Sequence, residues 1–187
     1  MATQSAVREL VPAEVSTPPP LSVERYLRSS IRPDCDFVDG QFEERNVGEF
    51  EHAWLQKALM RIFLPQEELW GVSLVQECRL QISESRFRVP DSMILKRGKT
   101  YRGVLHEAPL VCIEVLSPED SWMKLRERLD DYLSIGVEHV WCFEPEAREA
   151  RRYTANGFDR VTVPELTVPG TSVRVNIAAV FSILDEN

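Results

Sequence analysis

Two carboxylates stand where an acidic side chain is costly, and they are the strongest candidates for chemistry. Glu114 is the one charged residue in the apolar run LVCIEVL, residues 110–116. A buried, unpaired charge costs several kcal/mol, so such a group is protonated, paired or bound to a metal. Two interpretations stay open: a glutamate paired with arginine or lysine, or a metal ligand or general base at the carboxyl end of a central strand.

Asp91 is the second candidate, because it follows Pro90 inside an otherwise extended segment, residues 86–95. Proline within a strand indicates an edge, a bulge or a bend. A bend would turn the Asp91 carboxylate toward a neighbouring strand, although a plain Pro-Asp turn explains the same residues. The spacing alone favours neither interpretation.

The surrounding residues predict an α/β protein in which strands and helices position these acids. A strand, a helix and a strand follow one another over residues 110–143, so the two strands should be parallel. Ser117-Pro118 is a helix-start signal, and Asn156-Gly157 is a hairpin-turn signal. The predicted helices cover residues 22–30, about 50–63 and 119–134; the predicted strands cover about 73–81, 86–95, 110–116 and 139–143, followed by a hairpin over 148–163.

Composition predicts one domain and limits the class of partner. The 187 residues, 43% hydrophobic and 28% charged, suit a single domain over residues 21–187, after a flexible arm over 1–20 that ends in Ser-Thr-Pro-Pro-Pro. No run is apolar and long enough for a membrane span or a secretory signal, so we expect a cytoplasmic protein. The four scattered cysteines argue against a zinc site. The net charge of −8 counts against tight non-specific DNA binding.

Four short motifs, taken together, resemble one known family. They are DCDFVDGQFEE at 34–44, RVPD at 88–91, CIEVLSPED at 112–120 and RLDDYLSIGVEHVW at 128–141. Their order and spacing resemble the restriction endonuclease family known as Uma-two, a branch of the PD-(D/E)XK nuclease superfamily. The similarity runs from about residue 22 to the C-terminus. It implies a restriction-endonuclease-like fold, with a mixed central sheet flanked by helices.

The resemblance also implies a site and a reaction. Asp91 matches the aspartate of the family motif and Glu114 matches its second acid, and together they would hold Mg²⁺ or Mn²⁺. A divalent metal on hard oxygen ligands stabilises the charge that develops during phosphodiester hydrolysis and acidifies bound water. DNA is the implied substrate, and a homodimer is the implied assembly for cutting two strands.

The catalytic lysine of the superfamily is where this sequence departs from the pattern. The simple motif places it two residues after Glu114, where Leu116 stands. Relatives carry it on the next helix, four residues before a tyrosine; here that tyrosine is Tyr132 and the matching residue is Arg128. Lys124 lies one turn earlier and could share that helix face. Because arginine stays protonated, Arg128 could orient phosphate or water but would accept a proton poorly. A solvated basic stripe is the alternative, which we favour for Lys124 and not for Arg128.

The start of the helix over 50–63 supplies two weaker candidates, Glu51 and His52. In related nucleases an acid on this helix can join the metal ligands, which makes Glu51 a third possible ligand. An exposed helix start is the simpler explanation, because acids are favourable there. The tryptophans Trp54, Trp122 and Trp141 fall on predicted core stripes, so they do not predict a base-stacking surface.

Two functions therefore compete. The first is a metal-dependent DNA endonuclease that uses Asp91 and Glu114, with Arg128 or Lys124 in place of the usual lysine. The second is a catalytically weak or inactive nuclease-fold module that binds DNA or protein. Leu116, Arg128 and the acidic net charge favour the second.

Overall fold

The core of the fold is a mixed sheet with helices on both faces, as predicted. The computed structural model describes residues 21–30, 34–45, 49–118 and 120–186, so the arm predicted over 1–20 lies outside the described residues. Within these ranges, six strands pair in the order β10-β9-β8-β7-β6-β3. They are β3 (Val72–Gln76), β6 (Ser92–Lys96), β7 (Val111–Val115), β8 (His139–Glu144), β9 (Glu149–Thr154) and β10 (Gly157–Arg160).

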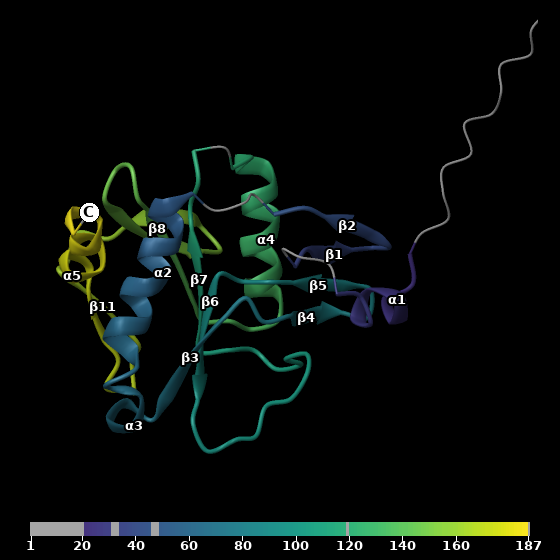
Figure 1. Cartoon of the computed structure of the whole chain (residues 1–187), viewed down its shortest axis with the longest axis horizontal. Helices are drawn as coiled ribbons and strands as arrows, with labels where there is room; N and C mark the ends of the chain where they lie inside the picture. Colours follow the sequence, from purple (N-terminus) through teal and green to yellow (C-terminus); the bar gives the residue numbers. More distant parts are fainter. Residues whose placement is uncertain (1–20, 31–33, 46–48, 119, 187) are drawn as a thin grey trace, which may run out of the picture.

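The strand–helix–strand unit has the predicted parallel pairing. Strands β7 and β8 run parallel, and every other neighbouring pair in this sheet is antiparallel. The helix between them is α4 (Trp122–Ser134), which packs on one face of the sheet. Helices α2 (Phe50–Phe63) and α5 (Ile177–Phe181) cover the other face (Figure 1).

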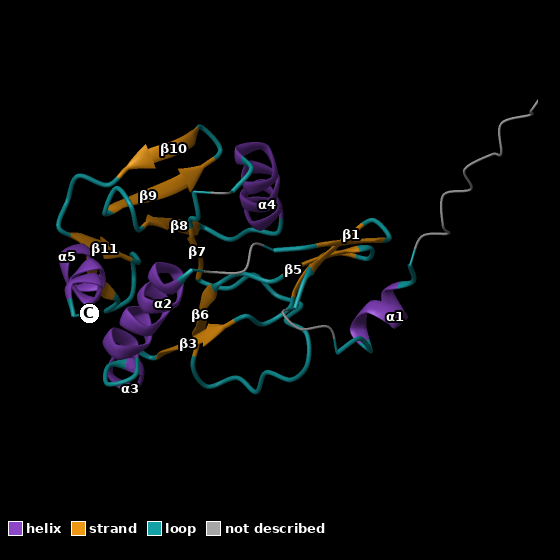
Figure 2. Cartoon of the chain, turned by 45° about the horizontal axis from the view of Figure 1, so that its top comes forward, coloured by secondary structure: helices purple, strands orange, loops and turns teal. Residues whose placement is uncertain are grey.

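A second, smaller sheet projects from the side on which α4 lies (Figure 2). Its order is β2-β1-β5-β4, with β1 (Asp36–Val38), β2 (Gln41–Glu43), β4 (Leu80–Ser83) and β5 (Arg86–Arg88). Helix α1 (Val23–Leu27) closes its core through Tyr26, whose ring stacks on Phe37 and contacts Phe87. The remaining elements are α3 (Glu67–Trp70), β11 (Glu165–Thr167), β12 (Arg174–Asn176) and η1 (Ser182–Asp185).

Alternation along β7 decides where Glu114 points. Val111, Ile113 and Val115 belong to the core beneath α2 and α5, whereas Cys112 belongs to the core beneath α4. Because side chains alternate between the two faces of a strand, Glu114 shares the α4 face with Cys112.

The segment predicted as one strand over 86–95 is divided at Pro90-Asp91. Its first part, β5, pairs in the smaller sheet, and its second part, β6, pairs in the central sheet. The bend therefore carries the chain from one sheet to the other and leaves Asp91 at the junction. A similar division ends β3 at Gln76, where Glu77 adopts a φ of 51°, so the strand predicted over 73–81 is wrong beyond that point.

The start of α4 and the environment of Trp122 also correct the sequence-based expectation. The helix begins at Trp122 with Ser121 as its N-cap, and not at residue 119. A turn precedes it, in which the Ser117 N–H donates to Asp120 Oδ2 (2.8 Å). This turn leaves the Trp122 side chain off the buried face, 54% exposed, with its ring edge against Phe158.

No helix in the described ranges has both the length and the apolar character that a bilayer span requires.

A buried arginine joins the smaller sheet to helix α4. Arg88, only 1% exposed, donates through Nε to Asp131 Oδ2 (2.7 Å) on α4. Its Nη1 donates to Asp36 Oδ2 (3.0 Å) on β1 and to Glu43 Oε2 (2.9 Å) on β2. One guanidinium therefore connects β5 with two neighbouring strands and with the helix that covers the central sheet.

We expect Arg88→Met to lower the free energy of unfolding by about 3 kcal/mol, because it removes one member of a buried ionic cluster. We place the loss at the low end of the usual range because Asp36 keeps Arg128 and Asp131 keeps Arg86. Urea unfolding followed by circular dichroism would measure it.

The matched control is Arg61→Met. Arg61 pairs with Glu186 (2.7 Å), but both side chains are half exposed, so the loss should be at most about 1 kcal/mol. Equal losses in the two variants would contradict a structural role for Arg88 at the sheet junction.

Candidate acidic site

Asp91 and Glu114 come together because β6 and β7 pair in register. Ser92 is the partner of Ile113, so one further step along the antiparallel ladder sets Asp91 beside Glu114. The two residues are 2% and 1% exposed. The backbone N–H of Val115 donates to Asp91 Oδ2 (2.7 Å), which fixes the carboxylate at the end of β7.

Arginine 45 bridges the two acids, and the sequence analysis did not identify it. Its Nη2 donates to Asp91 Oδ1 and lies 3.8 Å from Glu114 Oε2. The Arg45 side chain is only 13% exposed. Its one sequence signal is its place directly after the acidic motif at 34–44, and nothing in that motif indicates which acids it would meet.

Helix α4 supplies two further groups, both to Glu114. Tyr132 Oη donates to Glu114 Oε1 (2.6 Å), and Arg128 Nη1 donates to Glu114 Oε2 (3.2 Å). Residues four apart share a helix face, which explains why both reach the same carboxylate. Lys124, a further turn toward the helix start, is exposed, and no described contact joins it to either acid.

Asp36 is a third buried acid of the site that sequence reasoning missed. It is fully buried; its Oδ1 accepts the Val89 N–H (2.8 Å) and its Oδ2 lies 3.3 Å from Arg128 Nε. Its place between Cys35 and Phe37 is a weak signal, because a carboxylate flanked by apolar residues in a short strand is often buried. Ion pairs thus run without a break from Asp36 through Arg128 to Glu114.

Helix α2 approaches Asp91 from the opposite face. His52 Nε2 lies 3.4 Å from Asp91 Oδ1, and Gln56 Nε2 donates to the Asp91 carbonyl (3.2 Å). Glu51 is exposed, and in the described structure no contact connects it with the acidic pair. The structure therefore brings His52, and not Glu51, to the site from this helix.

The environment shifts the pKa values of the two carboxylates in opposite directions. Burial, together with the charge of Asp91, raises the pKa of Glu114 to about 7, although Arg128, Arg45 and Tyr132 oppose the increase. Burial alone would also raise the pKa of Asp91, but Arg45, His52 and the Val115 N–H outweigh it and hold that pKa well below its usual range. Asp91 is therefore the more firmly ionised of the two acids.

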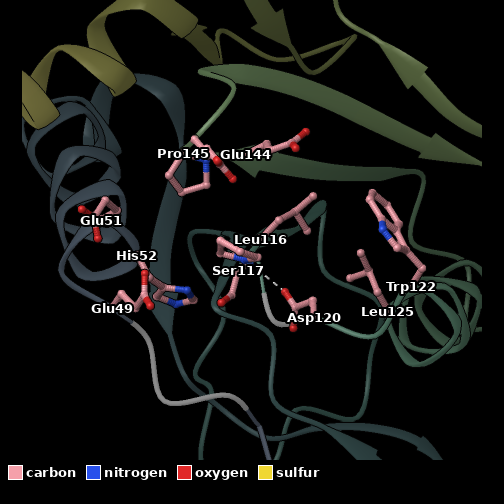
Figure 3. A pocket seen from close by; sticks show the side chains of 12 residues that line it. Glu49, Glu51, His52, Leu116, Ser117, Asp120, Trp122, Leu125, Glu144 and Pro145 are labelled. Carbon is pink, nitrogen blue, oxygen red and sulfur yellow. Dashed lines mark hydrogen bonds between the residues drawn. The ribbon is translucent and has the colours of Figure 1, made fainter.

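A cavity of about 550 Å³ adjoins the acidic pair. His52, which contacts Asp91, and Leu116, which follows Val115, both line it (Figure 3). Five carboxylates also line it, and none of its described lining residues is lysine or arginine. These acids are Glu49, Glu51, Asp120, Glu144 and Glu146. The cavity next to the pair is thus strongly acidic, although neither Asp91 nor Glu114 lines it.

The donor set fits a magnesium-type ion with few protein ligands. Among the described residues, no three histidine, cysteine or acidic side chains are grouped so that they could hold a metal ion. Asp91 and Glu114 nevertheless face one cationic nitrogen, Nη2 of Arg45. Mg²⁺ is often bound by one or two carboxylates, with water and substrate oxygens completing its shell. The pair meets that minimum, provided that Arg45 yields its place.

Comparison with solved structures supports the fold. A crystal structure of a protein described as a "putative nuclease belonging to DUF820", from Anabaena variabilis, matches with a TM-score of 0.73 and 18% identity. The match covers 88% of this chain and 99% of that one. A DrdV–DNA complex solved by cryo-electron microscopy matches with a TM-score of 0.35 and 13% identity, over 72% of this chain and 13% of the other. No curated protein matches this chain significantly.

The family comparison covers most of the chain. The model of the Uma2 family, whose description is "Putative restriction endonuclease", matches residues 23–179. That span contains both sheets, the acidic pair and its arginines. The chain therefore belongs to the Uma2 family of restriction-endonuclease-like proteins.

Proposed function

We propose that this protein is a divalent-metal-dependent DNA endonuclease in which Asp91 and Glu114 hold Mg²⁺ or Mn²⁺. The observation that carries the proposal is the convergence of two buried carboxylates, from the adjoining ends of β6 and β7, on a single cationic position near a cavity that His52 also lines. A bound metal would stabilise the charge that develops on the phosphate oxygens and acidify a bound water. The family description and the fold similarity support this class of activity.

The residues of this chain have distinct parts in the proposal. Asp91, held by the Val115 N–H, supplies the firmly ionised oxygen ligand. Glu114 supplies the second ligand, and Tyr132 and Arg128 act as positioning residues because their hydrogen bonds fix its two oxygens. Arg128 takes the family's lysine position on the helix but stays protonated, so we assign it to orientation and not to proton abstraction.

A specific observation favours the second function, an inactive nuclease-fold module. Both acids already have guanidinium partners, and the adjoining cavity is lined by acids that repel a phosphodiester backbone. Titration calorimetry with Mn²⁺ separates the two functions, because a module without metal chemistry has no reason to bind the ion. Failure to bind Mn²⁺ at low-millimolar concentrations would favour the module.

Loss of either acid should abolish the proposed cleavage. With Mn²⁺ and plasmid DNA, we expect Asp91→Asn and Glu114→Gln each to reduce the cleavage rate by about 100-fold or more, since each removes a charged metal ligand. The measurement is plasmid nicking resolved on agarose, with circular dichroism to show that each variant is folded.

The control for these variants is Glu68→Gln, an exposed acid on α3 at the far end of α2, which should cut at the wild-type rate. Undiminished cleavage by the Asp91 and Glu114 variants would remove the proposed site, and loss of cleavage by the control would point to charge or folding effects.

Substitutions of Lys124 and Arg128 should have very different effects on the cleavage rate in the same assay. We expect Arg128→Gln to slow cleavage by about 10-fold to 100-fold, the range typical of a residue that orients a metal ligand. Lys124→Gln should keep the wild-type rate, because Lys124 is exposed and contacts neither acid in the described structure. A large effect at Lys124 together with none at Arg128 would contradict the assigned positioning role.

A further inference from the structure

Arg45 holds the position that a metal would need between Asp91 and Glu114. Its Nη2 donates to Asp91 Oδ1 and lies 3.8 Å from Glu114 Oε2, so one nitrogen faces both proposed ligands. No other described arginine or lysine contacts both acids; Arg128 reaches only Glu114 and Asp36. Arg45 is thus the one described cation between the two carboxylates.

The charges around Asp91 and Glu114 explain why the Arg45 contact would affect metal binding. Asp91 and Glu114 carry two negative charges when ionised, and the guanidiniums of Arg45 and Arg128 already lie beside them, with Arg128 shared with Asp36. A divalent ion would add two positive charges beside these guanidiniums, in an interior where Asp91 and Glu114 are only 2% and 1% exposed and like charges repel strongly. If the Arg45 side chain moves away, the position between Asp91 and Glu114 becomes available to a metal ion. The same movement removes one of the two positive charges that would repel the ion.

The contacts that hold the Arg45 side chain would allow another cation to displace it from the acidic pair. Its hydrogen bond to the pair runs through Nη2, while its Nε is buried without a hydrogen-bond partner among the described residues. An unsatisfied buried donor costs free energy, so the guanidinium is retained mainly by the charges of the carboxylates. Those charges, against the effect of burial, raise the pKa of Arg45 above its ordinary value. A cation that neutralises the same carboxylates would weaken this hold directly.

We propose that Arg45 is a resident counter-ion that competes with divalent metal for the Asp91–Glu114 pair, and so sets the metal affinity of the site. The inference rests on the proposed function, because it takes these two acids as the metal ligands. In addition, Arg45 opposes metal binding, so the affinity for divalent metal should rise when Arg45 is removed.

Metal binding tests the proposal without relying on cleavage. We expect the full-length Arg45→Gln variant to bind Mn²⁺ at least about tenfold more tightly than the wild type in titration calorimetry, because one competing charge is gone. Without metal, its melting temperature should fall, since two buried acids lose a cation. Saturating Mn²⁺ should restore much of that loss, because a ligand of the folded state stabilises it.

Arg79→Gln is the matched control. The Arg79 side chain is also 13% exposed and also pairs with an aspartate, Asp34, but at the α1 end of the smaller sheet (Figure 1). Its loss should lower stability without changing Mn²⁺ affinity. Arg45→Lys, which keeps the charge on a different group, gives a second reading if Arg45→Gln does not fold; it should bind Mn²⁺ more tightly than the wild type, by a smaller factor.

The outcomes separate the two proposals. If the wild type binds Mn²⁺ and neither Arg45 variant binds it more tightly, the role of Arg45 is overturned while the metal site stands. If Arg45→Gln binds Mn²⁺ more tightly but neither protein cuts DNA, the role of Arg45 holds and the endonuclease proposal fails. If neither protein binds Mn²⁺, both proposals fall.

Discussion

The structure depends on how the charges of the acids buried at the junction of two sheets are compensated. Ion pairs alternate in sign through the described part of the chain, from Asp131 to Arg88, Asp36, Arg128, Glu114, Arg45 and Asp91. Each carboxylate would be prohibitively costly alone in this low-dielectric interior. Each arginine comes from a different segment of the chain than the acids that it meets. The electrostatic network therefore fixes how the smaller sheet, the central sheet and α4 are joined.

The same network defines what the site can do. Two of the buried acids that need compensation, Asp91 and Glu114, are those that a metal would use in the proposed reaction. Either a guanidinium or a divalent ion could neutralise the charges of Asp91 and Glu114. In the proposed role of Arg45, the stability of the protein without metal and its affinity for metal are therefore opposed. The acidic cavity beside the pair adds a second condition, because a phosphodiester would approach it against five carboxylates.

Family membership and local geometry answer different questions about this protein. The DUF820 structure matches the fold, and the Uma2 match gives the family on which the proposed class of activity is based. The ion pairs of Arg45 and Arg128 with the acidic pair come from the geometry of this chain. Arg128 stands at the position where the resemblance implies a lysine, and it is hydrogen-bonded to Glu114. Arginine keeps the positive charge at this position but is a poor proton acceptor.

The sequence by itself determined the elements whose signals are local. Helical spacing, the apolar run over 110–116 and the Asn-Gly turn identified α2, β7 and the last hairpin, because side-chain periodicity and turn chemistry act over a few residues. A charge inside an apolar run was enough to single out Glu114. The resemblance then linked it to Asp91. Local signals were weaker at the ends of elements, where the Ser117–Asp120 turn delayed α4 and exposed Trp122.

Only the tertiary structure decided which charges meet. Arg45 and Asp91 are separated by 46 positions, and Asp36 and Arg128 by 92, so no spacing rule connects them. The spacing of Lys124 and Arg128 would let them share one helix face. In the folded chain Arg128 reaches Glu114, whereas the Lys124 side chain is exposed, although Leu125 in the same turn is buried. Periodicity can say that an acid is buried, but the partner of a buried charge is chosen by packing between distant segments, and that choice exists only in the folded chain.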